Sequence, residues 1–234
     1  FAVGIRIEHP QKMINKSQYG MEFHPYLKQA SYKLTYKAKN GRGVYSFCMC
    51  PGGYVVNASS EENRLVVNGM SNYERESKNA NSAIVVTISS KDFGNNPLDG
   101  IAFQRNLEEK AYTEGKGNIP IQLYKDFKNN KVSTGFDNVV SITKGKTSFA
   151  NLNNIFPDFI IFSALLISNN NLLPSPFFTT LGAGHPIFIS TMSAKLLIYF
   201  DAYPMVSSSL PKICILIGLC SPSVFISSFV FESS

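Results

Sequence analysis

The stretch GVYSFCMCPGGYVV, residues 43–56, decides the fold expected for this chain. Two runs rich in aromatic and β-branched residues, 43–50 and 53–56, flank a Pro-Gly-Gly turn. Such side chains favour the pleated, half-buried surface of a strand, and glycine supplies the positive φ angles that tight connections require. The stretch therefore predicts two strands joined as a hairpin.

Strand-like runs continue on both sides of this hairpin. They lie at residues 1–7, 32–37, 64–69 and 82–89, mostly separated by short polar or glycine-containing segments. Helical spacing of apolar residues is found at residues 11–19, before Gly20, and again after Pro97. We therefore expect an α+β fold, a mainly antiparallel sheet built as a meander with a few helices.

Charge divides the chain of 234 residues into two parts. The whole chain has 22 basic and 16 acidic residues, but in residues 159–234 only Lys195, Asp201, Lys212 and Glu232 are charged. This second part is apolar and rich in serine, with no sustained period of 2 or 3.6. We therefore expect a domain at 1–158 and a tail at 159–234 that is non-native sequence or disordered.

The uncharged stretch between Lys212 and Glu232 is long enough to cross a bilayer. Pro222 and several serines interrupt it, and no basic cluster flanks it, so a membrane anchor is an alternative that we do not favour.

The formal net charge of +6 is spread over the first part rather than clustered, so no DNA partner is expected. The cysteines, Cys48, Cys50, Cys214 and Cys220, are too few for a disulfide framework, which favours a reducing, cytoplasmic setting. Their spacing, with no adjoining histidine set, predicts no metal site.

Cys48 and Cys50 are two apart on an expected strand, so both thiols should lie on one face, next to Gly52 and Gly53. Glycines at such a turn could let the backbone approach a flat ligand closely. Simpler interpretations are two small buried residues and two turn glycines. A disulfide between residues two apart in an extended strand would be strained.

Further candidates for a binding site lie at a strand end and in a polar segment. Arg6 and Glu8 should share one face of the first strand, where an exposed ion pair is the simpler alternative, and His9 could donate a proton. The polar segment of residues 68–82 is treated as a long loop, the usual location of binding residues. It contributes the candidates Arg75, Asn79 and Asn81.

Several long motifs occur together and in order: FAVGIRIEHPQ, YKLTY, NGRGVYSFCMCPGGYVV, ASSEENRLVVNGMS, ANSAIVV, the helix PLDGIAFQR and FPD at 156–158. Over residues 1–158 the chain resembles bacterial FAD-dependent dehydrogenase-like proteins. The resemblance implies that this stretch is similar to the C-terminal region of those flavoproteins, which includes a substrate-type domain inserted into a two-part FAD-binding domain. It also implies FAD as the cofactor of the complete protein, in which this domain covers the flavin and shapes the substrate pocket.

The resemblance also implies two glycine-rich segments, one upstream and one near the C-terminus, that complete the flavin site. No G-x-G-x-x-G motif occurs in this chain, so we expect a fragment of a FAD-dependent oxidoreductase that is inactive alone, with an unknown small-molecule substrate. The alternatives are a non-catalytic ligand- or RNA-associated module and a membrane-tethered protein.

Overall fold

A computed structural model describes residues 1–38, 40–137, 139–169 and 188–194. All of these residues belong to one unit, residues 1–194. The elements in chain order are β1 (Ala2–Pro10), α1 (Gln11–Tyr19), β2 (Thr35–Lys37), β3 (Gly43–Cys50), β4 (Gly53–Asn57), β5 (Val67–Ser71), β6 (Asn79–Thr87), α2 (Ser90–Phe93), α3 (Asp99–Glu114), β7 (Ile119–Leu123), α4 (Tyr124–Lys128), β8 (Thr147–Phe149), the 3₁₀ helix η1 (Leu152–Asn154), α5 (Asp158–Asn169) and β9 (Phe188–Ala194).

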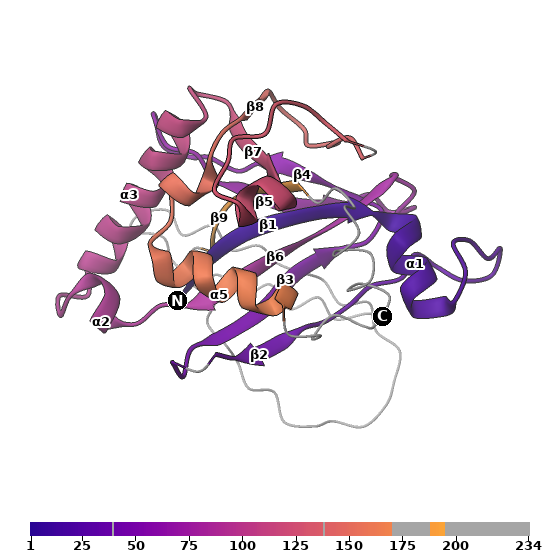
Figure 1. Ribbon diagram of the computed structural model, residues 1–234, viewed down its shortest axis with the longest axis horizontal. Helices are drawn as coiled ribbons and strands as arrows, with labels where there is room; N and C mark the ends of the chain where they lie inside the picture. The colour runs from indigo at the N-terminus through magenta and orange to yellow at the C-terminus, as the bar shows by residue number, and fades with distance from the viewer. Residues whose placement is uncertain (39, 138, 170–187, 195–234) are drawn as a thin grey trace, which may run out of the picture. The chain divides into compact units, whose positions relative to one another are not determined.

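Seven strands form one sheet in the order β2-β3-β6-β1-β9-β7-β8, and β4 and β5 form a separate two-stranded sheet (Figure 1). Every pairing is antiparallel except that of β7 with β8. The expected α+β class with a mainly antiparallel sheet is therefore confirmed.

The expected meander is wrong, because β3 pairs with β6 rather than β4, and β6 pairs with β1. Burial explains the difference. All residues of β6 except Thr87 are buried, and in β1 all except Ile7 and Pro10 are buried. Strands buried on both faces belong in the middle of a sheet, and without an alternation of buried and exposed residues their sequences carry no signal about which strand lies beside them.

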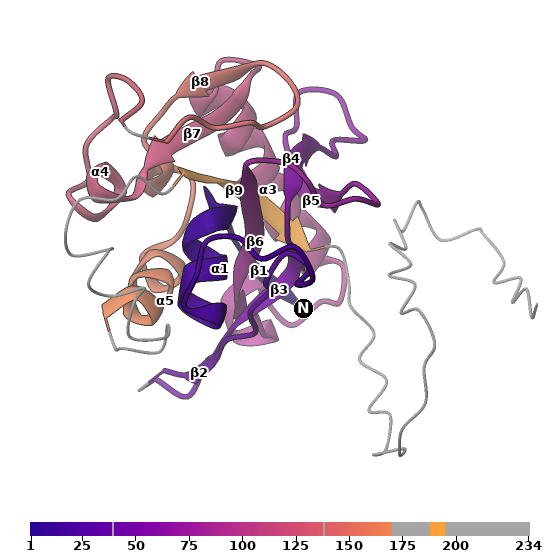
Figure 2. The ribbon, with the colours of Figure 1, turned by 90° about the vertical axis from the view of Figure 1, so that its right-hand side faces the viewer.

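The two faces of the large sheet are covered differently. Helices α1 and α5 lie on one face, and the β4–β5 hairpin lies on the other (Figure 2). Helix α1 covers the residues expected, 11–19, and ends at Gly20 in the left-handed conformation (φ 76°), where the glycine amide bonds back to the Lys16 carbonyl. The helix expected after Pro97 is α3, which packs against β7 and β9.

Two elements lie wholly or almost wholly within the segment expected to be a tail. Helix α5 begins at Asp158 and buries Ile160, Ser163 and Ala164, and β9 pairs with both β1 and β7. Residues 170–187 and 195–234, including Cys214 and Cys220, lie outside the described residues. Among the helices that the structure describes, none is long and apolar enough to cross a membrane.

Candidate functional site

The expected pair of thiols lies at an irregularity in β3. Phe47 pairs with Ala83 and Cys50 pairs with Asn81, so β3 advances three residues while β6 advances two. Such a bulge bends the strand and re-aims the side chains next to it. Cys48 has a positive φ of 47°, an uncommon backbone for a residue other than glycine. The spacing of the two cysteines predicted a regular strand with both thiols on one face. The structure instead places them at a bulge.

A buried arginine from β1 connects this bulge to β6. The Arg6 side chain is fully buried; its Nε donates to Asn81 Oδ1 at 2.7 Å, and its Nη2 donates to the Cys48 carbonyl at 2.6 Å. The same Nη2 lies 3.3 Å from Cys50 Sγ. We call Arg6, Cys48, Cys50 and Asn81 the Arg6 cluster; the structure thus brings four of the expected site residues together.

The two thiols of the cluster differ in environment. Cys50 is buried and its Sγ lies 3.3 Å from the Cys48 carbonyl oxygen, whereas Cys48 is half-buried. A hydrogen bond from the Cys50 thiol, with help from the positive charge of Arg6, lowers the pKa of Cys48 to about 6. The same hydrogen bond and burial raise the pKa of Cys50. The first proton to leave the pair therefore comes from Cys48.

Asn81 adds an unusual feature to the cluster. It is fully buried, and its Nδ2 has no hydrogen-bond partner among the described residues. A buried donor without an acceptor is uncommon and costs about 1–3 kcal/mol. Such a donor is a group that an acceptor on a bound molecule would satisfy.

Three glycines are required here for close packing within the chain. A Cβ on Gly69 of β5 would overlap the Arg6 guanidinium and Asn81 Oδ1, so β5 lies directly against the cluster. A Cβ on Gly52 or Gly53 would overlap the carbonyl oxygen of Arg75 or Met70. The space beside Gly52 and Gly53 is therefore filled by the chain's own backbone.

Glu8 and Asn79 form a second polar group with a loop that sequence reasoning missed. Glu8 accepts from Asn79 Nδ2 at 2.8 Å, from the Ile142 amide at 2.8 Å and from Ser141 Oγ at 2.7 Å. The alternative of an exposed Arg6–Glu8 ion pair is wrong, because both side chains are buried. No sequence signal pointed to residues 141–142, which lie in a polar segment without periodicity.

The remaining candidates are distributed around these two groups. His9 is buried, lies 2.8 Å from the Tyr32 hydroxyl through Nε2, and has its pKa lowered by burial to about 4. Asn79 and Asn81 belong to β6 and not, as expected, to a loop. Arg75 is exposed in the loop of residues 72–78, and its side chain makes no hydrogen bond or ion pair within the described ranges.

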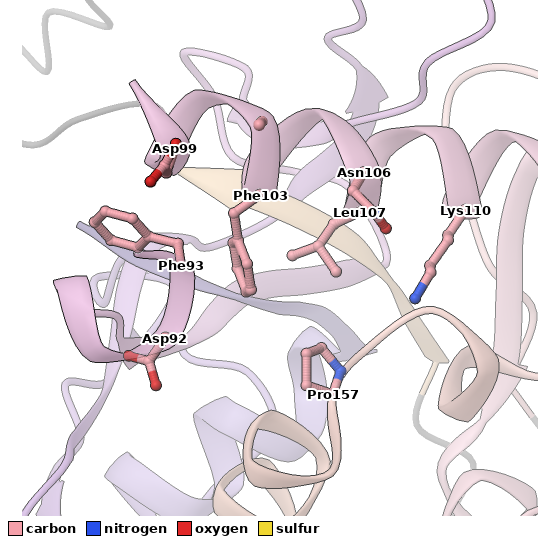
Figure 3. A pocket seen from close by; sticks show the side chains of 9 residues that line it. Asp92, Phe93, Asp99, Phe103, Asn106, Leu107, Lys110 and Pro157 are labelled. Atoms are coloured by element: carbon pink, nitrogen blue, oxygen red, sulfur yellow. The ribbon is translucent and has the colours of Figure 1, made fainter. Parts of the chain in front are cut away.

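A separate pocket of about 430 Å³ opens between α2, α3 and the start of α5 (Figure 3). Phe93, Phe103, Leu107 and Pro157 provide an apolar lining, and Asp92, Asp99, Asn106 and Lys110 add polar groups. No residue expected from the sequence as a site residue lines this pocket.

The described residues do not by themselves form a site for the pyrophosphate of a dinucleotide. Such sites use a glycine turn at a helix N-terminus, whose amides and positive dipole hold the phosphates. Gly52 and Gly53 have no room for a ligand, and α3 begins at Asp99, whose carboxylate accepts from the Asn96 amide. An acidic first turn repels phosphate, so we assign no phosphate-binding turn within the ranges that the structure describes.

Comparison with known proteins identifies the family. The model of a family described as "FAD-dependent protein, C-terminal domain-like" matches residues 1–167, which extends past the boundary expected at residue 158. An uncharacterised protein of Clostridium beijerinckii is 51% identical over 166 residues, which cover 69% of this chain and 31% of that protein. The chain thus spans about a third of the length of this relative. Because the family model covers most of the chain and the relative is this similar, the chain belongs to the family of FAD-dependent proteins with this C-terminal-like domain.

Proposed function

We propose that this chain is the substrate-side domain of a FAD-dependent oxidoreductase. The family match over residues 1–167 carries the proposal. The length of the relative supports it, since 69% of that protein lies outside the matched region and has ample room for a nucleotide-binding fold. In such an enzyme the flavin supplies the redox chemistry, and the protein supplies position, shape and electrostatics.

Within this proposal, the Arg6 cluster lies next to the flavin and its substrate and would meet them through Cys48, its one member that is not buried. It combines a buried positive charge, a half-buried thiol of low pKa and an unsatisfied buried donor. Groups with strongly perturbed pKa values and unsatisfied donors gather at functional sites. A small molecule with an anionic or hydrogen-bond-accepting group is therefore the substrate class that the cluster would suit.

The test compares this chain with a chimeric protein. Residues 1–167 replace the matching segment of the Clostridium beijerinckii relative, and both chimera and isolated chain are titrated with FAD. We expect the chimera to retain stoichiometric flavin through dialysis and the isolated chain to retain none. Contacts to one side of the flavin alone must overcome about 4–15 kcal/mol of lost translational and rotational freedom.

An Arg6→Lys change in the chimera, beside the matched control Lys128→Met at an exposed position, tests the cluster. The lysine keeps the charge but cannot bridge Asn81, the Cys48 carbonyl and Cys50 as Arg6 does. We expect unchanged flavin content and slower flavin reduction only in the Arg6 variant. A relative and a chimera that both fold but purify without flavin, and fail to take it up, would favour the non-catalytic binding module instead.

A further inference from the structure

The two thiols of the Arg6 cluster are placed for chemistry with each other. The bulge in β3 re-aims Cys48, Cys50 Sγ lies 3.3 Å from the Cys48 carbonyl oxygen, and Arg6 Nη2 contacts both residues. The bulge and this close approach set the pair apart from two cysteines in a regular strand. We propose that Cys48 and Cys50 form a redox-active dithiol that exchanges electrons with small-molecule disulfides, a role independent of the proposed flavin function.

The exposure of the two residues assigns their roles. Cys48 is half-buried and can meet a reagent, whereas Cys50 is 6% exposed and lies behind it. The outer thiol is therefore the attacking group and the inner thiol is the resolving group.

Charges around the pair favour a thiolate at Cys48. The titratable groups that face the pair are Arg6 from β1 and, near Arg6 and Cys50, Tyr32 from the segment before β2. Burial raises the pKa of Tyr32, so this group stays neutral, and Arg6 supplies the positive charge. A thiolate next to a buried cation is the reactive form of cysteine.

The reaction balances in two exchange steps. The Cys48 thiolate attacks a disulfide RSSR, forming Cys48–S–SR and releasing RS⁻. The Cys50 thiol then loses its proton to the released RS⁻ and attacks Cys48 sulfur, forming the Cys48–Cys50 disulfide and releasing a second RS⁻, which takes a proton from solvent at neutral pH. Two electrons pass from the dithiol to RSSR, and a reducing thiol reverses both steps.

The chain offers a direct assay that needs no substitution. Trypsin cleaves after Arg42 and Arg64, so the peptide of residues 43–64 holds Cys48 and Cys50 and excludes Cys214 and Cys220. The full chain is reduced, desalted, incubated with glutathione disulfide at pH 7, quenched with acid and N-ethylmaleimide, and digested. We expect the peptide to lose both maleimide adducts together and to become lighter by two hydrogen atoms, and dithiothreitol to restore both adducts.

Two variants separate the roles. Cys50→Ser should stop at a glutathione mixed disulfide on Cys48, and Cys48→Ser should react at least about tenfold more slowly, because Cys50 is buried and has a raised pKa. Phenylarsine oxide, which bridges adjacent thiols, should protect both cysteines of the reduced wild-type chain from maleimide. This last measurement uses the wild-type chain, so it does not depend on whether a variant folds.

The pH dependence gives a further signature. At pH 6 a thiol with a pKa of about 6 has on the order of 100 times more thiolate than an ordinary thiol, and its weaker intrinsic nucleophilicity leaves a rate advantage of about tenfold. The alkylation rate of Cys48 should therefore reach half its maximum near pH 6. A peptide that keeps two maleimide adducts at every glutathione disulfide concentration, or that reacts first at Cys50, would overturn the proposal. Flavin retention by the chimera does not depend on either result.

Discussion

Replacing Gly69 with alanine tests the contact between the β4–β5 hairpin and the large sheet. A Cβ at this position would overlap Arg6 Nη2, Arg6 Cζ and Asn81 Oδ1, and none of these is the free end of an exposed side chain. Overpacking of a filled site costs about 1–3 kcal/mol. If the guanidinium moves off Asn81, the lost hydrogen bond to a charged group adds about 1.5–3 kcal/mol.

We therefore expect the Gly69→Ala change to lower the free energy of unfolding by about 2.5–6 kcal/mol. Gly135→Ala is the matched control, because no atom lies within 4 Å of its added Cβ; its lower chain entropy when unfolded should stabilise the protein by up to about 1 kcal/mol. Urea unfolding followed by circular dichroism measures the free energy of unfolding of both variants. The reaction of the peptide of residues 43–64 with glutathione disulfide shows whether the Arg6 cluster is disturbed. Equal unfolding midpoints for the two variants would refute the argued packing of β5 on Arg6.

Three further predictions address other parts of the fold. In the folded protein the pKa of His9 is about 4, whereas in the unfolded chain it is about 6.5. The unfolded chain therefore binds a proton first as the pH falls, and the free energy of unfolding should decrease by about 3 kcal/mol between pH 6.5 and pH 4. Denaturant titrations at several pH values should show a smaller decrease for the His9→Gln variant. Glu8→Gln places an amide donor among the donors from Asn79, Ser141 and Ile142 and should lower the free energy of unfolding by about 2–4 kcal/mol. The Ile142 amide should then exchange its hydrogen faster, and unchanged exchange would contradict the assigned contacts. A chain ending at residue 194 should keep the cooperative unfolding transition. A chain ending at residue 169 lacks β9, leaves the edges of β1 and β7 unpaired and should aggregate. The same solubility and the same unfolding transition in both chains would exclude β9 from the sheet.

Local structure could be predicted from the sequence more fully than topology. The limits of α1 follow from apolar spacing and from Gly20, and β3 and β4 follow from residue type around the Pro-Gly-Gly turn. The pairing of β6 with β1 and β3 does not follow, since both faces of β6 are buried and its apolar run has no alternation to assign.

The candidate site could be predicted in its members but not in its contacts. Arg6, Cys48, Cys50 and Asn81 were each expected, but the bulge that joins them depends on pairing between distant strands. For Arg6, an exposed ion pair with Glu8 was the simpler alternative to a site role, because charged residues are rarely buried without partners. One of the partners that permit its burial, Asn81, lies 75 positions away along the chain.

The order of the strands also sets the order in which the fold can form. Ala2, at the start of β1, pairs with Ala194, at the end of β9, so the first and last described strands are neighbours. A ribosome must release almost the whole unit before this pairing closes, and until then the edges of β1 and β7 are open to strands of other chains. Contacts so distant in sequence also slow folding. This protein should therefore depend on chaperone binding during synthesis more than a domain whose sheet is built from neighbouring hairpins.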